Sequence, residues 1–432
     1  MKGVTTVKNF LTVLTAIALF GLIACEGPAG PAGKDGATGA TGKDAGFVYF
    51  EGFKADLKCA TCHAPNDVDT TFRVITKSTQ YETSGHKELG NYDRNTTTCA
   101  GCHTNEGFFE RTTRGVANET FTLNAASGPM VNQNYYSSSP VGCFTCHTPH
   151  KRGDFTLRDT VGQVKIFSLV AGNTTKTFTG NTTAQLCVKC HQPRMTSQFL
   201  IGTTNLSWQP DPTKTGATDT AKIYTSRWNN HVSGEGIQTL LGFGGVEFAG
   251  YTYSSSYHST ALQNKTLDCA DCHMATPIGN KGGGHTFKVG YIPEGSTTTS
   301  YNFAGCNTTS CHGTSGAITS TSAKWATVRA EMTGKIRQLA SIMMDSTVVG
   351  KWTVKKAGKF NPWITMTVST TTGDTSYAAN ANTGTNVLQI IPAAKAGALW
   401  NLQMAIYEAS HGIHNTAYTR SLLDASIAEL KK

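Results

Sequence analysis

Apolar positions recur at helical spacing near the C-terminal end of the chain. The first such series is Trp325, Val328, Met332, Ile336, Leu339 and Met343. Steps of three and four residues predict an amphipathic helix of about six turns. Similar patterns predict helices over 393–410 and 415–430, the latter presenting Leu422, Leu423, Ile427 and Leu430. Between the first and second helix, residues 351–370 predict an extended excursion around Pro362.

The longer region 47–316 has a different pattern. It is poor in long amphipathic runs, and its short β-like segments, such as residues 164–170, show no sheet pattern. The 432 residues would suffice for two or three ordinary domains. A region of this size without a periodic apolar face needs another source of buried apolar surface.

The N-terminus has the pattern of an export signal. Lys2 and Lys8 precede an apolar run, Phe10 to Ile23, that is short for a membrane span. The following Leu22-Ile23-Ala24-Cys25 resembles a bacterial lipobox, in which the signal 1–24 is removed and Cys25 is lipidated. Glu26 after the cysteine favours the outer membrane by analogy. The alternative is an ordinary signal peptide with a stray cysteine.

A glycine repeat follows Cys25. Glycine recurs at every third position, at Gly27, Gly30, Gly33, Gly36, Gly39 and Gly42. This G-X-Y pattern is typical of collagen, whose triple helix would make the protein a trimer. Six triplets with two prolines are few for that, so we predict that 25–46 is a lipid anchor and an extended tether.

Six cysteine–histidine motifs occupy the region 47–316. Five are C-x-x-C-H, with the cysteines Cys59 and Cys62, Cys99 and Cys102, Cys143 and Cys146, Cys187 and Cys190, and Cys269 and Cys272. The sixth is stretched and has four residues between Cys306 and Cys311. C-x-x-C-H is typical of covalent haem c attachment, in which two thiols form thioethers and the histidine becomes the proximal iron ligand. Zinc also suits paired cysteines, but a zinc site does not need a histidine after each pair.

The cysteine count supports this interpretation. Twelve of the 13 cysteines lie in the six motifs and the remaining one is Cys25, so no pair is left for a structural disulfide. The proximal ligands would be His63, His103, His147, His191, His273 and His312. Haem attachment takes place outside the cytoplasm, in agreement with the export signal. We therefore predict six haem c groups.

The remaining histidines nearly match the second axial positions of six haems. Seven of the 13 histidines lie outside the motifs, and bis-histidine ligation needs six. The distal candidates are His86, His150, His231, His258, His285 and His414, with His411 as the spare. His150 lies three residues after His147, too close to bind the same iron, so we expect it to reach a neighbouring haem. Met274 and Met195 are alternative ligands.

The preference for His414 comes from a resemblance. The residues that carry it are Asn401-Leu402, Ser410-His411-Gly412-Ile413-His414-Asn415, Tyr418 and Leu422-Leu423. They resemble the C-terminal helical segment of multihaem cytochromes related to the ammonia-forming nitrite reductases. In that pattern the histidine before the asparagine is a haem ligand, which implies His414. Thr416 departs from the pattern, because the family often has proline there.

In architecture the whole chain resembles the outer-surface multihaem c-type cytochromes of metal-respiring bacteria. The resemblance implies a mainly α fold with extensive loops and little β structure, in which stacked haems form the core. The expected domains are the hexahaem core 47–316 and a haem-free helical domain 317–432. The resemblance also implies electron transfer at the outer cell surface. The expected partners are other cytochromes or an outer-membrane conduit, and extracellular metal oxides, electrodes or partner cells.

Two alternatives to a lipid-anchored electron carrier remain. One is a nitrite- or hydroxylamine-type oxidoreductase, which needs a haem with an open axial position, whereas no C-x-x-C-K motif occurs here. The other is a subunit of a conducting cytochrome filament. We expect an electron carrier rather than an enzyme, and no catalytic residues. The net charge of +9 is spread without a dense basic patch, so no nucleic-acid partner is expected.

Overall fold

A computed structural model of the chain describes most of the region after residue 72. The described residues are 73–88, 91–113, 131–148, 156–158, 164–170, 175–193, 211–224, 235–344, 364–368, 375–379 and 388–432, except positions 132, 169, 217 and 315. All of them belong to one compact unit, Tyr49–Lys432. The expected signal, the anchor at Cys25 and the glycine repeat lie outside the described residues.

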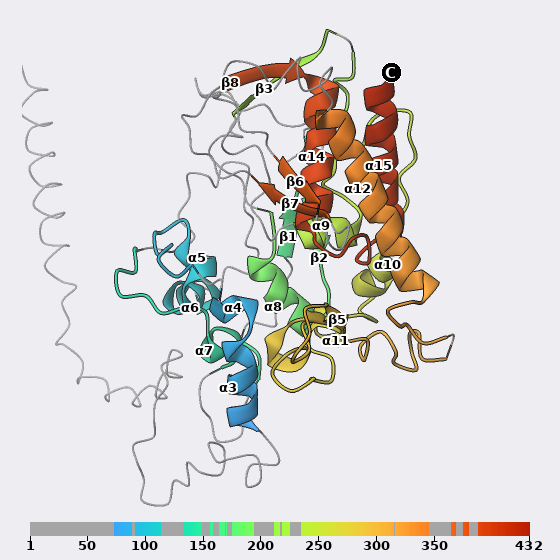
Figure 1. Ribbon diagram of the computed structural model, residues 1–432. Helices are drawn as coiled ribbons and strands as arrows, with labels where there is room; N and C mark the ends of the chain where they lie inside the picture. Colours follow the sequence, from blue (N-terminus) through green and yellow to red (C-terminus); the bar gives the residue numbers. More distant parts are fainter. Residues whose placement is uncertain are drawn as a thin grey trace, which may run out of the picture. The chain divides into compact units, whose positions relative to one another are not determined.

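Short helices are the main elements of the described residues before residue 320 (Figure 1). The helices are α3 (Val74–Glu82), α4 (Gly85–Glu88), α5 (Ala100–His103), α6 (Asn105–Thr113), α7 (Cys143–Cys146), α8 (Thr182–Cys190), α9 (Glu235–Leu241), α10 (Tyr257–Gln263), α11 (Cys269–His273) and the 3₁₀ turn η2 (Gly284–Thr286). No helix among them exceeds nine residues, in keeping with the absence of long amphipathic runs in the sequence. No helix within the described residues is long and apolar enough to cross a membrane.

The described strands form four two-stranded antiparallel sheets. The strands are β1 (Val164–Phe167), β2 (Thr175–Phe178), β3 (Thr220–Tyr224), β4 (Gly290–Tyr291), β5 (Ser300–Tyr301), β6 (Ile364–Val368), β7 (Thr375–Ala379) and β8 (Leu388–Pro392). They pair as β1–β2, β3–β8, β4–β5 and β6–β7. The expected mainly helical fold with little strand is confirmed. The β-like run at 164–170 is a hairpin strand, with Val164 opposite Phe178.

Three longer helices follow near the C-terminus and pack on one another (Figure 1). They are α12 (Val328–Met344), preceded by a π-helical turn η3 (Ala323–Thr327), α14 (Ala393–Tyr407) and α15 (Thr416–Lys431). The three predicted helices are therefore confirmed. Helix α14 ends three residues earlier than predicted, because Ala409 and His411 adopt left-handed backbone conformations with φ of 56° and 54°. Of the predicted excursion 351–370, only β6 lies within the described residues.

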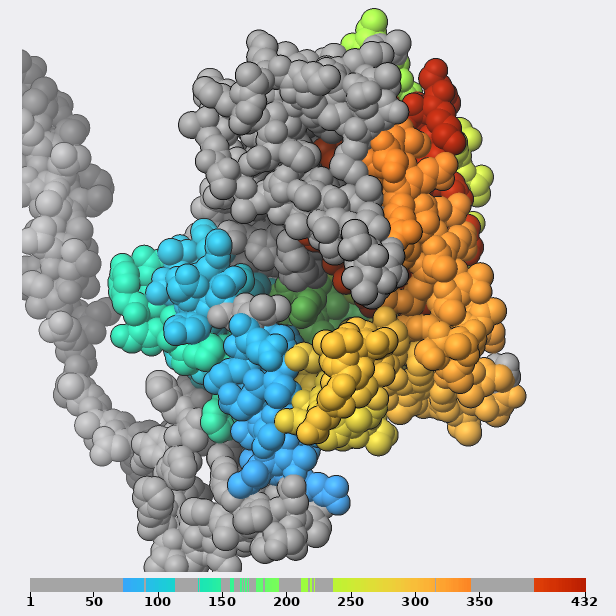
Figure 2. Space-filling view, viewed as in Figure 1, coloured from blue at the N-terminus to red at the C-terminus, as the bar shows by residue number. Residues whose placement is uncertain are grey.

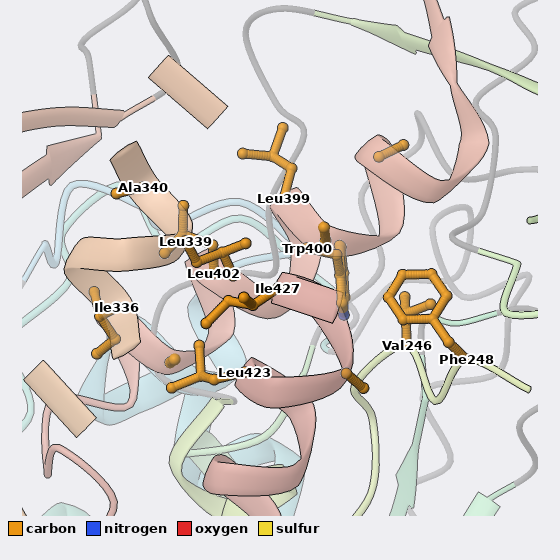
Figure 3. Packing of buried hydrophobic residues seen from close by; sticks show 14 of the residues in the cluster. Val246, Phe248, Ile336, Leu339, Ala340, Leu399, Trp400, Leu402, Leu423 and Ile427 are labelled. Carbon is orange, nitrogen blue, oxygen red and sulfur yellow. The ribbon is translucent and has the colours of Figure 1, made fainter. Parts of the chain in front are cut away.

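The largest apolar cluster lies between these helices (Figure 3). It contains Ile336 and Leu339 from α12, Leu399 and Trp400 from α14, and Leu423 from α15. Segments before residue 316 also contribute to it, including Ala221 on β3 and Val246 with Phe248 in the loop after α9. The Trp400 indole nitrogen donates to the Gly244 carbonyl at 3.0 Å, and Asn401 bonds both backbone groups of Val246. The C-terminal helices thereby fix the loop that leads into α10.

A second, smaller apolar cluster lies within the motif-bearing region. It joins the β1–β2 hairpin to helices α8, α9 and α10 through Ile166, Phe178, Val188, Leu241 and Leu262. The sequence did not predict this cluster, because its members come from five short segments without a common periodicity. Helix α8, which ends in the fourth motif, is therefore supported by protein contacts of its own.

Candidate functional site

One turn of helix organises four of the five described motifs. These are the second to fifth motifs, on α5, α7, α8 and α11. Positions three and four residues apart are neighbours on a helix. Each turn therefore brings two cysteines and a histidine to one side of the backbone. The amide of the motif histidine donates to the carbonyl of the first cysteine, at 3.2 Å for His103 and at 2.9 Å for His147 and for His191.

The stretched sixth motif reaches the same closure by another route. It forms a series of turns instead of a regular helix, yet the His312 amide donates to the Cys306 carbonyl at 3.0 Å. Two further residues between the cysteines are thus accommodated in a loop, and the histidine returns to the first cysteine as in the short motifs. The first motif, with Cys59, Cys62 and His63, lies outside the described residues, as do His150 and His231.

Four motif histidines each face a histidine from outside the motifs. The pairs and their ring-centroid separations are His86 with His191 at 5.9 Å, His147 with His285 at 6.3 Å, His258 with His312 at 6.4 Å, and His273 with His414 at 6.3 Å. We name these pairs after their motifs: the third site is His147/His285, the fourth His191/His86, the fifth His273/His414 and the sixth His312/His258. Every pair joins one predicted proximal residue to one predicted distal residue.

The separation within the pairs fits a metal ion between two imidazoles. An imidazole nitrogen binds a metal at about 2 Å, and each ring centroid lies about 1 Å behind that nitrogen. Two opposed ligands therefore place their centroids about 6 Å apart, as in all four pairs. Among the described residues, no group of three or more His, Cys, Asp or Glu side chains is placed to hold a bare metal ion. The donor set of two histidines with two adjacent cysteines fits haem c.

In three of these histidines the ring nitrogen Nδ1 has a hydrogen-bond partner that fixes the ring. Nδ1 of His258 donates to the Ile413 carbonyl at 2.8 Å, and Nδ1 of His273 donates to the Phe287 carbonyl at 3.0 Å. Nδ1 of His414 lies 3.0 Å from a carboxylate oxygen of Glu408. Such bonds are typical of metal-ligating histidines, because they fix the tautomer and leave Nε2 for the metal.

Burial favours the neutral form of His285 and of His273. It lowers the pKa of His285 to about 4, with His147 and Lys77 adding to the shift. Burial is also the main cause that lowers the pKa of His273, followed by His414. A neutral imidazole offers a lone pair to a metal, so the buried environment prepares both rings as ligands.

His411 and His414 occupy different surroundings although they are three residues apart. His414 faces His273, whereas Nδ1 of His411 lies 3.1 Å from the Thr333 hydroxyl on α12. The left-handed backbone at His411 turns the chain between the two side chains. Of these two, the structure brings His414 to a motif histidine.

Helix α3 positions the histidine of the glycine-rich loop. The Gln80 side chain accepts a hydrogen bond from the His285 amide at 3.1 Å and donates to the Gly279 carbonyl at 3.0 Å. Gly284 has a φ of 51°, and a Cβ there would lie 2.5 Å from the Gln80 oxygen. The glycine is therefore required by close packing against α3. Figure 2 shows the blue surface of α3 beside the yellow segment that contains η2.

Phe287 links three of the sites. The sequence placed an aromatic residue near His285 but did not indicate this role. The Phe287 ring packs against His86 at 4.8 Å and against His285 at 6.0 Å, and its carbonyl holds His273. The third, fourth and fifth sites thus meet at one residue. Its left-handed backbone, with φ of 57°, directs the ring and the carbonyl to these different neighbours.

Cysteines of different motifs are also in contact. The thiols interact in three pairs: Cys102 with Cys190, Cys187 with Cys269, and Cys272 with Cys306. In each pair the contact and burial raise the pKa of one thiol, that of Cys190, Cys187 and Cys272 respectively. These contacts arrange the motifs in the order second, fourth, fifth and sixth. The Cys146 thiol of the third motif interacts electrostatically with Cys187, which shows that the third motif lies beside the fourth.

A buried arginine reinforces the contact between the second and fourth motifs. The Arg111 guanidinium on α6 donates to the Gly101 carbonyl at 3.2 Å, to the Cys102 sulfur at 3.1 Å and to the Lys189 carbonyl at 2.9 Å. Sequence reasoning did not identify Arg111, because it lies outside the motifs and no local pattern marks it. The same holds for Glu408 beside His414.

The chain shows little similarity to known proteins. No protein-family model and no curated protein match the chain. Among solved structures, the crystal structure of the outer cell wall cytochrome OcwA is similar, with a TM-score of 0.41 and 15% sequence identity. The similarity covers 82% of this chain and 50% of that chain, so the chain spans about half of the length of that cytochrome. At this level the similarity assigns neither a family nor a function.

Proposed function

We propose that the chain is a six-haem c-type cytochrome that transfers electrons, with both axial positions of each iron filled by histidine. The observation that carries the proposal is the set of four histidine pairs, each of one motif and one non-motif residue, at separations of 5.9 to 6.4 Å. Unrelated surface histidines would have no reason to meet the motif histidines one by one at this spacing.

The residues that would hold the cofactors follow from the motifs and the pairs. The twelve motif cysteines would form the thioethers, and the six motif histidines would be the proximal ligands. The distal ligands would be His285, His86, His414 and His258 at the third to sixth sites. His150 and His231 are the candidates for the first and second sites.

Bound haem supplies reversible one-electron chemistry. The chain's own residues determine how that chemistry is used. The paired histidines would hold the iron from both sides and leave no position for a substrate there. The proximity of Cys187 and Cys269 would keep neighbouring sites together. These features favour electron transfer over reduction of a small molecule.

The setting of this activity is part of the proposal. The signal 1–24 and Cys25 would export the chain and anchor it to outer-membrane lipid, and the segment 25–46 would act as a tether. At the cell surface the protein would exchange electrons with other cytochromes or an outer-membrane conduit, and with extracellular metal oxides, electrodes or partner cells.

Absorption and electron paramagnetic resonance spectra of the purified protein test the proposal. We expect six haems by mass, all low-spin in the ferric state, and a stoichiometric high-spin haem would overturn bis-histidine ligation throughout. Two variants make the test specific. His258→Met should convert one haem to histidine–methionine ligation, with its characteristic sulfur-to-iron charge-transfer band. His411→Met is the matched control and should leave the spectrum unchanged.

A further inference from the structure

Glu408 is a carboxylate enclosed by the protein beside the fifth site. It follows the last residue of α14, and its side chain is 0% exposed. One carboxylate oxygen accepts from the Gly412 amide at 2.9 Å. The other accepts from the Ser410 hydroxyl at 2.6 Å and from Nδ1 of His414 at 3.0 Å. The chain from α14 to His414 therefore wraps around this carboxylate.

The loop is built to satisfy an anion. His414, Ser410 and Gly412 direct three hydrogen bonds at the two carboxylate oxygens of Glu408. All three partners are donors, and a carboxylate that accepts several hydrogen bonds is stabilised in its charged form. Ser410 also accepts from the His414 amide at 3.0 Å, so the same residues fix the backbone of the histidine.

Two other paired histidines, His258 and His273, have neutral partners at the same ring position. His258 donates to the carbonyl of Ile413, and His273 donates to the carbonyl of Phe287. A carboxylate partner draws the ring proton more strongly than a carbonyl and makes the imidazole a stronger electron donor. The buried charge also acts across a medium of low dielectric constant, where electrostatic interactions are large. Both effects favour ferric over ferrous iron, since the ferric state carries one more positive charge.

We propose that Glu408 lowers the reduction potential of the fifth site relative to the other sites, because a negatively charged carboxylate accepts the hydrogen bond from His414. The inference rests on the proposed function, because it takes His414 as an axial ligand. Glu408 is a positioning residue in this proposal, since it acts on the iron only through the imidazole. Its consequence is a step in potential next to the sixth site, which the Cys272–Cys306 contact makes its neighbour.

Spectroelectrochemical titration of the complete haem-loaded protein and of Glu408→Gln tests the proposal. Glutamine keeps the size of the side chain and removes its charge. We expect one of the six components to shift upward so that its ratio of reduced to oxidised haem at a fixed potential rises at least tenfold, which is about 59 mV for one electron. The other five components should stay in place.

Glu429→Gln is the matched control. Glu429 is also buried, with a side chain 4% exposed, but it bonds Lys432 and Tyr251 and contacts no paired histidine. Its substitution should leave all six components unchanged. An unchanged titration of Glu408→Gln with six low-spin haems overturns the proposal. An equal shift in the two variants also overturns it, because the effect would then not depend on His414.

Glu408→Asp keeps the test decisive where Glu408→Gln does not take up all six haems. Aspartate retains the charge, but its shorter side chain draws the carboxylate away from Nδ1 of His414. We expect one component to shift upward so that its ratio of reduced to oxidised haem at a fixed potential rises by less than tenfold, and no shift would overturn the proposal. His414→Met separates this inference from the proposed function. If His414→Met leaves the spectrum unchanged, the ligand assignment fails; if the spectrum changes but neither Glu408 variant shifts a component, the role of Glu408 alone fails.

Discussion

Single polar side chains hold the paired histidines in place. Asn415 follows His414 and is fully buried, and its side-chain oxygen accepts from the amide of Ser256, from the hydroxyl of Ser256 and from the amide of Tyr418, at 2.8, 3.0 and 3.2 Å. Ser256 precedes α10, which carries His258. One amide side chain therefore caps α15 and fixes the start of α10, next to His414 of the fifth site and His258 of the sixth.

Asn415→Ala should destabilise the protein by about 2–4 kcal/mol. Loss of a helix cap costs about 1 kcal/mol, and leaving the half-buried Ser256 amide without a partner costs roughly 1–3 kcal/mol more. Chemical unfolding of the haem-loaded protein, followed by absorption, measures the loss. Asn415→Asp retains the acceptor at two helix N-termini, where negative charge is favourable, and should lose less. Equal losses would show that the acceptor is not what matters.

Gly284→Ala should cost more than Gly279→Ala. Both glycines have positive φ, 51° and 55°, so alanine at either position is strained by roughly 1–2 kcal/mol. Only the Cβ at position 284 would meet Gln80, at 2.5 Å, while that at position 279 meets nothing within 4 Å. The Gly284 variant should also displace His285 and produce one high-spin haem in the ferric spectrum. Identical spectra and stabilities for the two variants would contradict the role of Gln80.

At the scale of elements, apolar packing and ion pairs both join α12 to α15. Leu423 on α15 is fully buried against Ile336 and Leu339 on α12 (Figure 3). At the edge of the same interface, the Arg420 guanidinium makes two bonds to the Glu331 carboxylate, at 2.6 and 2.7 Å. The Arg420 side chain is 41% exposed, so water and salt screen that pair.

Leu423→Ala should therefore destabilise the protein far more than Arg420→Ala. Removing a buried leucine costs about 2–5 kcal/mol, whereas an exposed ion pair contributes about 0–1 kcal/mol. Unfolding at low and high salt separates the two effects. The loss of stability caused by Arg420→Ala should shrink at high salt, because salt already weakens the ion pair of the unsubstituted protein, whereas the loss caused by Leu423→Ala should not change. A larger loss for Arg420→Ala would mean that the ion pair dominates the interface.

The elements that the sequence predicted are those with local signals. The helices at 325–343, 393–410 and 415–430 follow from apolar positions that repeat within each segment. The motif residues follow from chemistry that is contiguous in the chain. The pairing of His86 with His191, the β3–β8 ladder and the contact of Arg111 with Cys102 depend on packing between distant segments. No periodicity or spacing within one segment contains that information.

At the scale of the whole molecule, the cysteine contacts order the motifs differently from the sequence. The fourth motif contacts the second through Cys190 and the fifth through Cys187, and Cys146 of the third lies close to it. The sixth contacts the fifth through Cys306, and its Cys311 is exposed. Among the five motifs that the structure describes, the fourth is central and the sixth lies at an end.

Removing the fourth attachment site should therefore affect the molecule differently from removing the sixth. Substituting both cysteines of a motif by alanine, Cys187 and Cys190 or Cys306 and Cys311, should lower the mass by one haem in each case. After partial reduction by rapid mixing, redistribution of electrons among the remaining haems should keep its rate without the sixth site. It should slow without the fourth, because the second site then loses its described connection to the fifth.

The central variant carries a risk of misfolding, because α8 also contributes to the smaller apolar cluster. His86→Met avoids that risk, since it leaves both thioethers of the fourth motif intact and changes only the distal ligand. Methionine in place of histidine raises the potential of that site, so it would hold electrons and slow redistribution in the same way. The matched variant His258→Met, at the sixth site, should leave exchange among the other sites unchanged. Equal slowing by the two methionine variants would contradict a central fourth site and a terminal sixth site.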